Sequence, residues 1–133
     1  MATLVTLADR PDLIEDIFVF AEAVWPRFVW DRDDYVNRSW PRLSTDFAAF
    51  QQILLDDDGT IMASGNSIPF VLQSPSIADL PAGFEDVFSQ GMYTHDCNGQ
   101  ASALALLSIA ISDKYQSRGI SQHLVQAMKA NPV

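Results

Sequence analysis

The stretch from Gln116 to Ser121, which reads Gln-Ser-Arg-Gly-Ile-Ser, has the residue types of a turn that binds phosphate. It follows an apolar run that predicts a buried strand, and it opens a segment with helical spacing. Backbone N–H groups at a helix start have no partner inside the helix and carry the positive end of its dipole. Gly119 lets the backbone approach a ligand closely, and Lys114 and Arg118 add positive charge. The pattern therefore predicts an anion site at this turn.

The alternative is a plain turn, because a short turn with glycine before a helix is common in proteins that bind no ligand there. The charge distribution bears on both interpretations. Residues 1–96 hold sixteen acids and five arginines, a net charge of −11, whereas residues 97–133 have a net charge of +2. The second segment can accept a compact polyanion, although a helix that merely lacks acids gives the same count. The acidic remainder repels nucleic acid and anionic lipid, so we expect neither as a partner.

The chain has the size and composition of one globular domain, residues 1–133. Hydrophobic residues make up 48% of it, and its apolar runs are too short to cross a bilayer. A single cysteine, Cys97, excludes an internal disulfide, and the N-terminus has no signal-peptide pattern. We therefore expect a cytoplasmic protein. The acid triplet at 56–58 lacks the ligand spacing of a calcium loop, so we read it as a turn and expect no metal.

Strands and helices alternate in a way that predicts an α/β (α+β) fold with a mixed sheet. Apolar periodicity and turn residues give the following elements: a strand at Thr3–Leu7, a helix from Asp9 to Trp25 that ends at Pro26, an irregular link to Trp40 with room for a short helix, a second helix capped at 44–46 and running to Leu54, two short strands at Thr60–Ala63 and Ser67–Leu72 separated near Gly65, a helical turn at Phe84–Gln90, a strand at Leu104–Ile111, and a helix at Gly119–Ala130.

The turn at 116–121 resembles the acetyl-CoA signature of GNAT-superfamily N-acyltransferases, Gln/Arg-x-x-Gly-x-Gly/Ala, and the strand before it and Tyr115 fit the same pattern. Ser121 stands in place of the commoner Gly or Ala, and Asp113 in place of a common proline. The resemblance implies that the CoA pyrophosphate lies on the N–H groups of this turn and that pantetheine runs beside the strand before it. The cofactor-binding residues it implies are Ile109, Ala110, Ile111, Gln116, Ser117, Arg118, Gly119, Ile120 and Ser121.

This resemblance implies an acetyl-CoA-dependent N-acetyltransferase that acts on an amine of a small-molecule acceptor. A non-catalytic CoA-binding or dimerising module and a plain interaction domain are the alternatives. In the family, further strands follow the CoA-binding helix, so we expect a GNAT-like fold that is incomplete at its C-terminus. The strand at 104–111 would then have an open apolar edge, which favours a homo-oligomer. We also expect little acetyl transfer from residues 1–133 alone.

Outside the turn, the segment from Tyr93 to Cys97 places a base, an acid and a thiol in sequence. Neighbours in sequence rarely have the geometry of a nucleophile pair, so we do not expect Cys97 to act as one. The resemblance suggests that this segment lines the acceptor cleft, where His95 or Asp96 would help to deprotonate an amine; a solvated turn is the alternative. An aromatic cluster can form a core contact or one wall of the acceptor pocket. Its members are Trp25, Phe28, Trp30, Tyr35 and Trp40.

Overall fold

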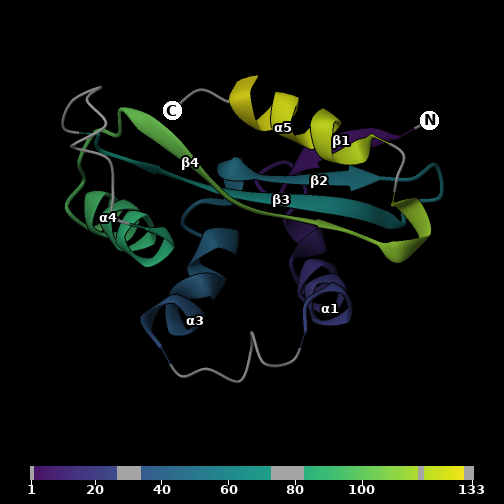
Figure 1. Ribbon diagram of the computed structural model, residues 1–133, viewed down its shortest axis with the longest axis horizontal. Helices are drawn as coiled ribbons and strands as arrows, with labels where there is room; N and C mark the ends of the chain where they lie inside the picture. The colour runs from purple at the N-terminus through teal and green to yellow at the C-terminus, as the bar shows by residue number, and fades with distance from the viewer. Residues whose placement is uncertain (1, 27–33, 73–82, 117–118, 131–133) are drawn as a thin grey trace.

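The computed structural model describes residues 2–26, 34–72, 83–116 and 119–130. Within them four strands form one antiparallel sheet in which each strand pairs with its neighbour in sequence, in the order β1-β2-β3-β4. Figure 1 shows α5 on one face of the sheet and α1 and α3 on the other, with α4 at one end. The elements are β1 (Thr3–Thr6), η1 (Pro11–Leu13), α1 (Ile14–Val24), α3 (Tyr35–Ser39), η2 (Trp40–Ser44), η3 (Ala48–Phe50), β2 (Gln51–Leu55), β3 (Ile61–Phe70), α4 (Phe84–Asp96), β4 (Ala103–Ile111), η5 (Asp113–Tyr115) and α5 (Ile120–Ala130).

The α/β class expected from the sequence is confirmed, and the described strands are all antiparallel rather than mixed. The first strand, the strand of the apolar run and the last helix lie within one residue of their expected bounds. The first helix ends one residue before its expected end, but it begins at Ile14, after the single turn η1, and not at Asp9. These elements carry strong periodicity and clear ends, such as Pro26 directly after the first helix. The acid triplet forms the expected turn, which Gly59 closes with a φ of 87°.

Alternation along the central strands gives each face of the sheet its own core. Leu54 packs with Ala63 and with Leu124 of α5 on one face. Ile53, one residue earlier, packs with Ile17 of α1 on the other face. Because successive side chains of a strand point to opposite faces, β2 is covered on both sides, and all five of its residues are buried.

The second expected helix is wrong, because Gln51–Leu55 is the strand β2. Phe47, Phe50, Ile53 and Leu54 have helical spacing, but a short apolar run also fits a strand covered on both faces. Pairing with β1 and β3 decides between them, and the only helical part is the single turn η3. The preference of the chain for helix is therefore overridden by the position of this segment at the centre of the sheet.

Two further expectations near the middle of the chain are corrected. The two short strands separated near Gly65 form one ten-residue strand, β3, in which Gly65 lies within the paired region. The expected helical turn at Phe84–Gln90 continues to Asp96 as α4, so the Tyr93–Cys97 segment is mostly helix and not an extended turn. The sequence also predicts a loop with two prolines at Gln73–Gly83, and all of it except Gly83 lies outside the described residues.

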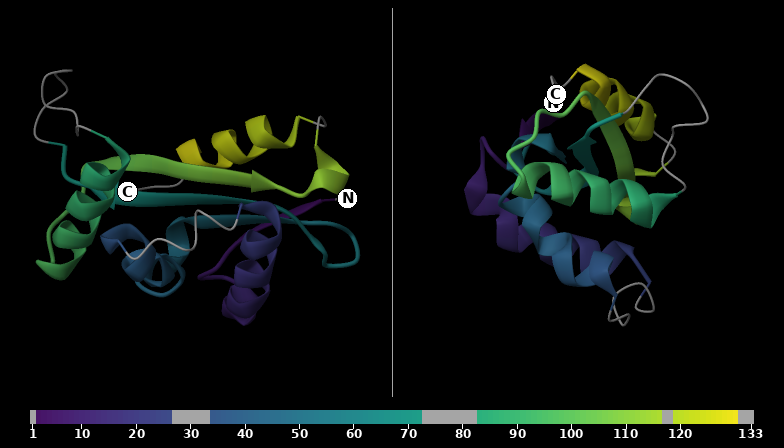
Figure 2. Two further views of the ribbon diagram at one scale, coloured as in Figure 1. Left: turned by 60° about the horizontal axis from the view of Figure 1, so that its bottom comes forward. Right: turned by 90° about the vertical axis from the view of Figure 1, so that its left-hand side faces the viewer.

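Two close approaches of backbone to side chain determine how α4 and α5 sit on β3. A Cβ placed on Gly65 would lie 2.7 Å from the Met128 sulfur, so α5 rests directly on the backbone of β3. A Cβ placed on Gly91 of α4 would lie 2.6 Å from Ile68 and 3.0 Å from the backbone oxygen of Pro69. Figure 2 shows from two further directions that α4 and α5 are on opposite faces of the sheet. No helix among the described residues is long and apolar enough to cross a membrane.

We expect Gly91→Ala to destabilise the fold by about 1–3 kcal/mol, the usual effect of overpacking a core, even though alanine favours helix. The reason is that one of the atoms in contact is a backbone oxygen, which cannot rotate away. Gly83→Ala is the matched control, since a Cβ there meets nothing within 4 Å. Urea unfolding of both variants measures the difference, and equal midpoints would contradict the packing described here.

Candidate functional site

The described part of the turn between β4 and α5 places an exposed glycine at the start of the last helix. Gly119 has a φ of 70°, a conformation that residues with a side chain rarely adopt. A Cβ at this position would meet no atom within 4 Å, so the backbone lies open to solvent. Ile120, the first residue of α5, is buried and fixes the start of the helix against the sheet. The first N–H groups of α5 therefore stand at an exposed, anchored helix start.

Side chains of η5 attach this turn to the sheet. The Tyr115 hydroxyl donates to an Asp56 carboxylate oxygen at 2.5 Å, and the Tyr115 side chain is buried. The Gln116 amide donates to Asp113 at 3.1 Å and to the backbone oxygen of Ile111 at 3.4 Å. The Lys114 ammonium lies 5.5 Å from the centre of the Tyr115 ring. Ser117 and Arg118, which the sequence also assigns to this site, lie outside the described residues.

The strand before the turn offers a free edge. β4 is the last strand of the sheet order, and among the described residues only β3 pairs with it. Ile109 and Ile111 pack toward α5, whereas Ala110 is buried on the opposite face. The pairing of β3 with β4 shifts at Asn66/Ser67, which leaves Leu107 of β4 as a β-bulge. Bulges are frequent beside active sites because they redirect the backbone.

His95 and Asp96 lie at the C-terminal end of α4, which is at the other end of the sheet from the start of α5 (Figure 1). Arg42 of η2 joins two carboxylates there, at 2.7 Å from Asp46 and 2.5 Å from Asp96. The hydrogen bond from Arg42 holds the pKa of Asp96 below its ordinary value. The His95 ring packs on Phe47, with centroids 4.9 Å apart, and its Nε2 lies 3.8 Å from Asp46. The structure thus brings His95 and Asp96 together, but in an ion-pair cluster; their catalytic role stays a prediction.

Cys97 follows this cluster and is exposed. A hydrogen bond with Cys97 raises the pKa of Tyr93, one turn earlier on α4. The described residues contain no group of three or more His, Cys, Asp or Glu side chains that could hold a metal ion. The chemistry available at this end of the sheet is therefore that of a surface cluster of charges and one thiol.

A small cavity of about 30 Å³ lies on the α1 face of the sheet, between α1, η2 and the central strands. Trp25 and Trp40 line it, so two members of the aromatic cluster predicted from the sequence meet here. Trp40 is held in place by stacking on Phe88, with centroids 5.8 Å apart. Tyr35 instead packs edge-on against Phe88. Phe28 and Trp30 lie outside the described residues.

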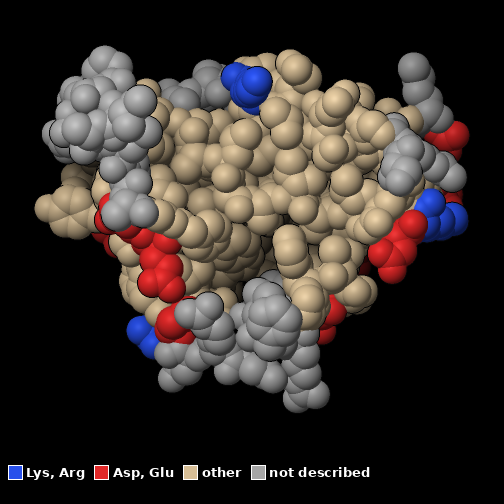
Figure 3. All heavy atoms as spheres, viewed as in Figure 1, with Lys and Arg blue, Asp and Glu red and all other residues tan. Residues whose placement is uncertain are grey.

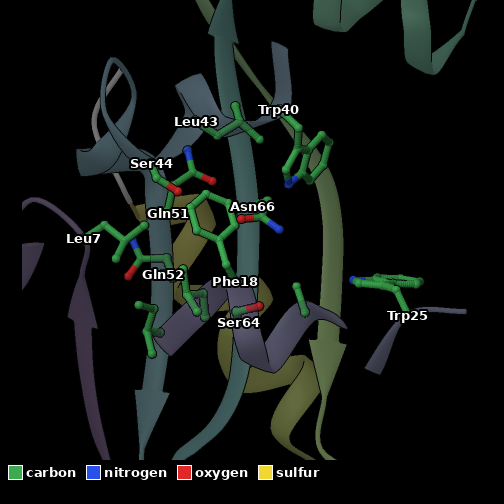
Figure 4. Close-up of a pocket in the computed structure, with 13 residues that line it drawn as sticks. Leu7, Phe18, Trp25, Trp40, Leu43, Ser44, Gln51, Gln52, Ser64 and Asn66 are labelled. Atoms are coloured by element: carbon green, nitrogen blue, oxygen red, sulfur yellow. The ribbon is translucent and has the colours of Figure 1, made fainter. Parts of the chain in front are cut away.

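The wall of this cavity formed by the sheet is polar. Gln51, Ser64 and Asn66 line it from β2 and β3. Figure 4 shows Trp25 and Trp40 on the side nearest β4, with the indole nitrogen of each turned toward the cavity. Figure 3 shows that the surface below β4 is hollowed between α3 and α1, and that its charged residues gather at the margins.

Sequence reasoning missed Ser64 and Asn66 because the polar run Ser-Gly-Asn-Ser within 64–67 was interpreted as a break between two strands. Apolar residues flank the run on both sides, and in the structure it lies within β3. A polar run inside an otherwise apolar strand was thus the available signal. It indicates buried hydrogen-bonding groups as well as it indicates a turn.

No protein-family model and no curated protein sequence matches the chain. Solved structures do match it. The loading GNATL domain of CurA from Lyngbya majuscula is similar with a TM-score of 0.66 and 16% identity, over 96% of this chain and 56% of that one. The chain has a GNAT-like fold. The GphF GNAT-like decarboxylase, solved in complex with isobutyryl-CoA, is similar with a TM-score of 0.61 and 17% identity, over 98% of this chain and 58% of that one.

The GNAT-like fold confirms the fold that the 116–121 motif implied. The chain spans a little more than half of the length of each of these two structures. At this level of identity the likeness concerns the fold, and the roles of single residues depend on the geometry given above.

The cluster around Arg42 gives a prediction about pH. The lowered pKa of Asp96 means that its pairing stabilises the fold above the unfolded value of about 3.9 and that this contribution is lost as the pH falls through the folded value. We therefore expect Asp96→Asn to lower the denaturant midpoint at pH 7, with the difference from the native chain vanishing toward pH ~2.

Glu22→Gln is the control for Asp96→Asn, since Glu22 is an exposed acid of α1 for which the described residues give no ion pair. It should show no comparable loss at pH 7. A loss in Asp96→Asn that is the same at every pH would show that the carboxylate acts through its shape and not through its charge.

Proposed function

We propose that the chain binds an acyl-CoA thioester at the β4–α5 turn and belongs to an enzyme that transfers an acetyl group from acetyl-CoA to an amine of a small molecule. The observation that carries the proposal is Gly119, with its positive φ, at the exposed start of α5 directly after an edge strand. An exposed helix N-terminus of this kind suits a pyrophosphate. The GNAT-like fold and the isobutyryl-CoA in the GphF structure support the same ligand class.

In this proposal the pyrophosphate rests on the N–H groups of residues 116–121, and Lys114 contributes charge from one side. The outer edge of β4 at 109–111 pairs with the pantetheine amides, since no described strand uses the backbone donors and acceptors on that edge. The protein's contribution to rate is then mainly to hold the amine against the thioester, since proximity alone supplies a large share of such accelerations.

Removal of the proton from the amine is the proposed role of His95 or Asp96. The hydrogen bond from Arg42 lowers the pKa of Asp96 and so makes it a weaker base than an ordinary carboxylate. His95 has one edge near Asp46 and one face on Phe47, so its ring is oriented. His95 is therefore the residue whose replacement tests the catalytic part of the proposal.

A second candidate function, a dimerising CoA-binding module, is favoured by the outer edge of β4. Leu106 on this strand is 43% exposed, and among the described residues no strand pairs with that edge. An apolar strand with unpaired N–H and C=O groups is a template for another strand. A second copy that pairs through this edge would cover both the backbone groups and the apolar side chains.

We expect Gly119→Asp to weaken acetyl-CoA binding at least tenfold, or about 1.4 kcal/mol, because a carboxylate would stand where the phosphates lie. Isothermal titration calorimetry with acetyl-CoA measures this. Gly119→Asn is the matched control: it has the same size, it also tolerates a positive φ, and it carries no charge. It should keep more affinity than the Asp variant, and equal affinities of the native chain and Gly119→Asp would refute the site.

We expect Leu106→Lys to shift the chain toward monomer, because a charge on an edge strand opposes strand addition. Sedimentation velocity over a range of concentrations measures the state. Val19→Lys on α1, which is 67% exposed and is not part of the edge strand, is the control and should leave self-association unchanged. A native chain that stays monomeric at high concentration would contradict the dimerising alternative.

A further inference from the structure

The cavity on the α1 face contains a buried polar group that has no partner within the part of the chain that the structure describes. Ser64 is 4% exposed, it lines the cavity, and its hydroxyl makes no hydrogen bond to any of the described residues. Ser67, three residues along the same strand, is also buried, but its hydroxyl donates to the backbone oxygen of Phe50 at 2.6 Å. The difference is meaningful because buried polar groups without a partner are rare and destabilising.

The polar residues next to Ser64 are of two kinds: some are hydrogen-bonded within the fold, and others have groups available to a ligand. The Gln51 amide donates to the backbone oxygens of Phe47 and Ser67, both at 2.9 Å, and accepts from the Ser67 N–H. Both N–H groups of the Gln51 amide, and one acceptor position of its oxygen, are thus used within the fold. The amide nitrogen of Asn66 donates to the Ser108 hydroxyl at 3.0 Å, and its oxygen has no partner among the described residues. Ser64 and the Asn66 oxygen are therefore a donor and an acceptor offered to the cavity from β3. The buried Ser44 and Gln52 also line the cavity, and their side chains have no hydrogen bond to any of the described residues.

The remainder of the lining restricts the charge of an occupant. Of the thirteen residues that line the cavity, none is Asp, Glu, Lys, Arg or His. An ionised group would lose its hydration there without a counter-charge, which is costly in a buried site. A neutral group that both donates and accepts hydrogen bonds, such as a primary amide or a hydroxyl, matches the lining.

The size and opening of the cavity indicate that it takes the end of a larger molecule. About 30 Å³ is the space of one or two small groups. Figure 4 shows Trp25 and Trp40 on the side of the cavity nearest β4, and Figure 3 shows that the surface below β4 is hollowed. Aromatic walls beside a few placed polar groups are typical of small-molecule sites.

We propose that this cavity binds the neutral amide or hydroxyl end of a small-molecule ligand, with Ser64 donating to it and the Asn66 oxygen accepting from it. The proposal that this ligand is a reactant rests on the acyl-transfer function proposed above. The group belongs either to the acceptor or to the acyl chain of the thioester. Asn66 links the two sites, since its partner Ser108 lies on β4 one residue before the proposed pantetheine strand segment.

The test uses acetamide as the probe and the indole N–H signals of Trp25 and Trp40 in NMR spectra as the readout. We expect saturable shifts with acetamide and none with acetate or methylammonium at the same concentrations. Ser64→Val, which replaces the hydroxyl with a methyl group and fills part of the cavity, should weaken the acetamide response at least tenfold. It should leave the urea midpoint unchanged or raise it, because an unpartnered buried hydroxyl is removed.

Ser67→Ala is the matched control, since it removes a buried serine hydroxyl of the same strand that has a partner and does not line the cavity. It should lower the urea midpoint and keep the acetamide response. Acetamide that gives no saturable shift would overturn the proposal and leave the cavity as the site of an ordered water only. Equal responses to acetamide and acetate would overturn the inferred neutrality.

A second set of titrations distinguishes the two sources of the group. If it belongs to the acyl chain, 3-hydroxybutyryl-CoA should displace acetamide, whereas butyryl-CoA should do so more weakly. If it belongs to the acceptor, acetamide should bind alongside either thioester. Failure of acetyl-CoA to bind would refute the proposed function and still leave the acetamide result standing, so the two proposals fail separately.

Discussion

The close contact of α5 with the backbone of β3 at Gly65 is the constraint on which the candidate site depends. Met128 occupies the space that a side chain at position 65 would fill, so the helix lies directly on the sheet. Leu124, one turn earlier, is fully buried against the same face. The packing of Met128 and Leu124 fixes the axis of α5 and therefore the position of its N-terminus. That position brings Gly119 to the end of β4, where the strand leaves an open edge.

The two faces of the sheet therefore differ in role: one positions α5, and the other contains the cavity. One face holds α5 and a close-packed cluster of hydrophobic residues, which suits an element whose position must not vary. The other face holds α1, η2 and a cavity with polar groups from the strands. Buried polar groups reduce stability unless they are bonded. Gln51 makes three hydrogen bonds within the fold, whereas the Ser64 hydroxyl makes none to the described residues. A role in ligand binding explains the difference between Gln51 and Ser64 better than packing does.

The sequence alone was sufficient where the local pattern and the final environment agree. The apolar run of β4 and the turn at Gly119 could be interpreted correctly because strand, turn and helix are all consistent locally. The strand β2 could not be predicted, because its apolar spacing also fits a helix. Only its pairing with β1 and β3 makes it a strand. The partner of Asp96 could not be found either, because Arg42 lies 54 residues away from it in sequence. Contacts of that range leave no periodic signal in the chain.

The bulge at Leu107 also affects whether β4 can lose one residue without disturbing the fold. Leu107 and Ala105 pack toward α3 and α4, and Ser108 faces the same side through its bond to Asn66, so two consecutive side chains share one face. In a regular strand the loss of one residue turns every later side chain to the wrong face. Here the extra residue is already outside the alternation, so its deletion would keep Ile109 and Ile111 directed at α5 and Ala105 directed at α4. A strand of this kind can change by one residue in evolution without exchanging its two faces, and position 107 is where that change would occur.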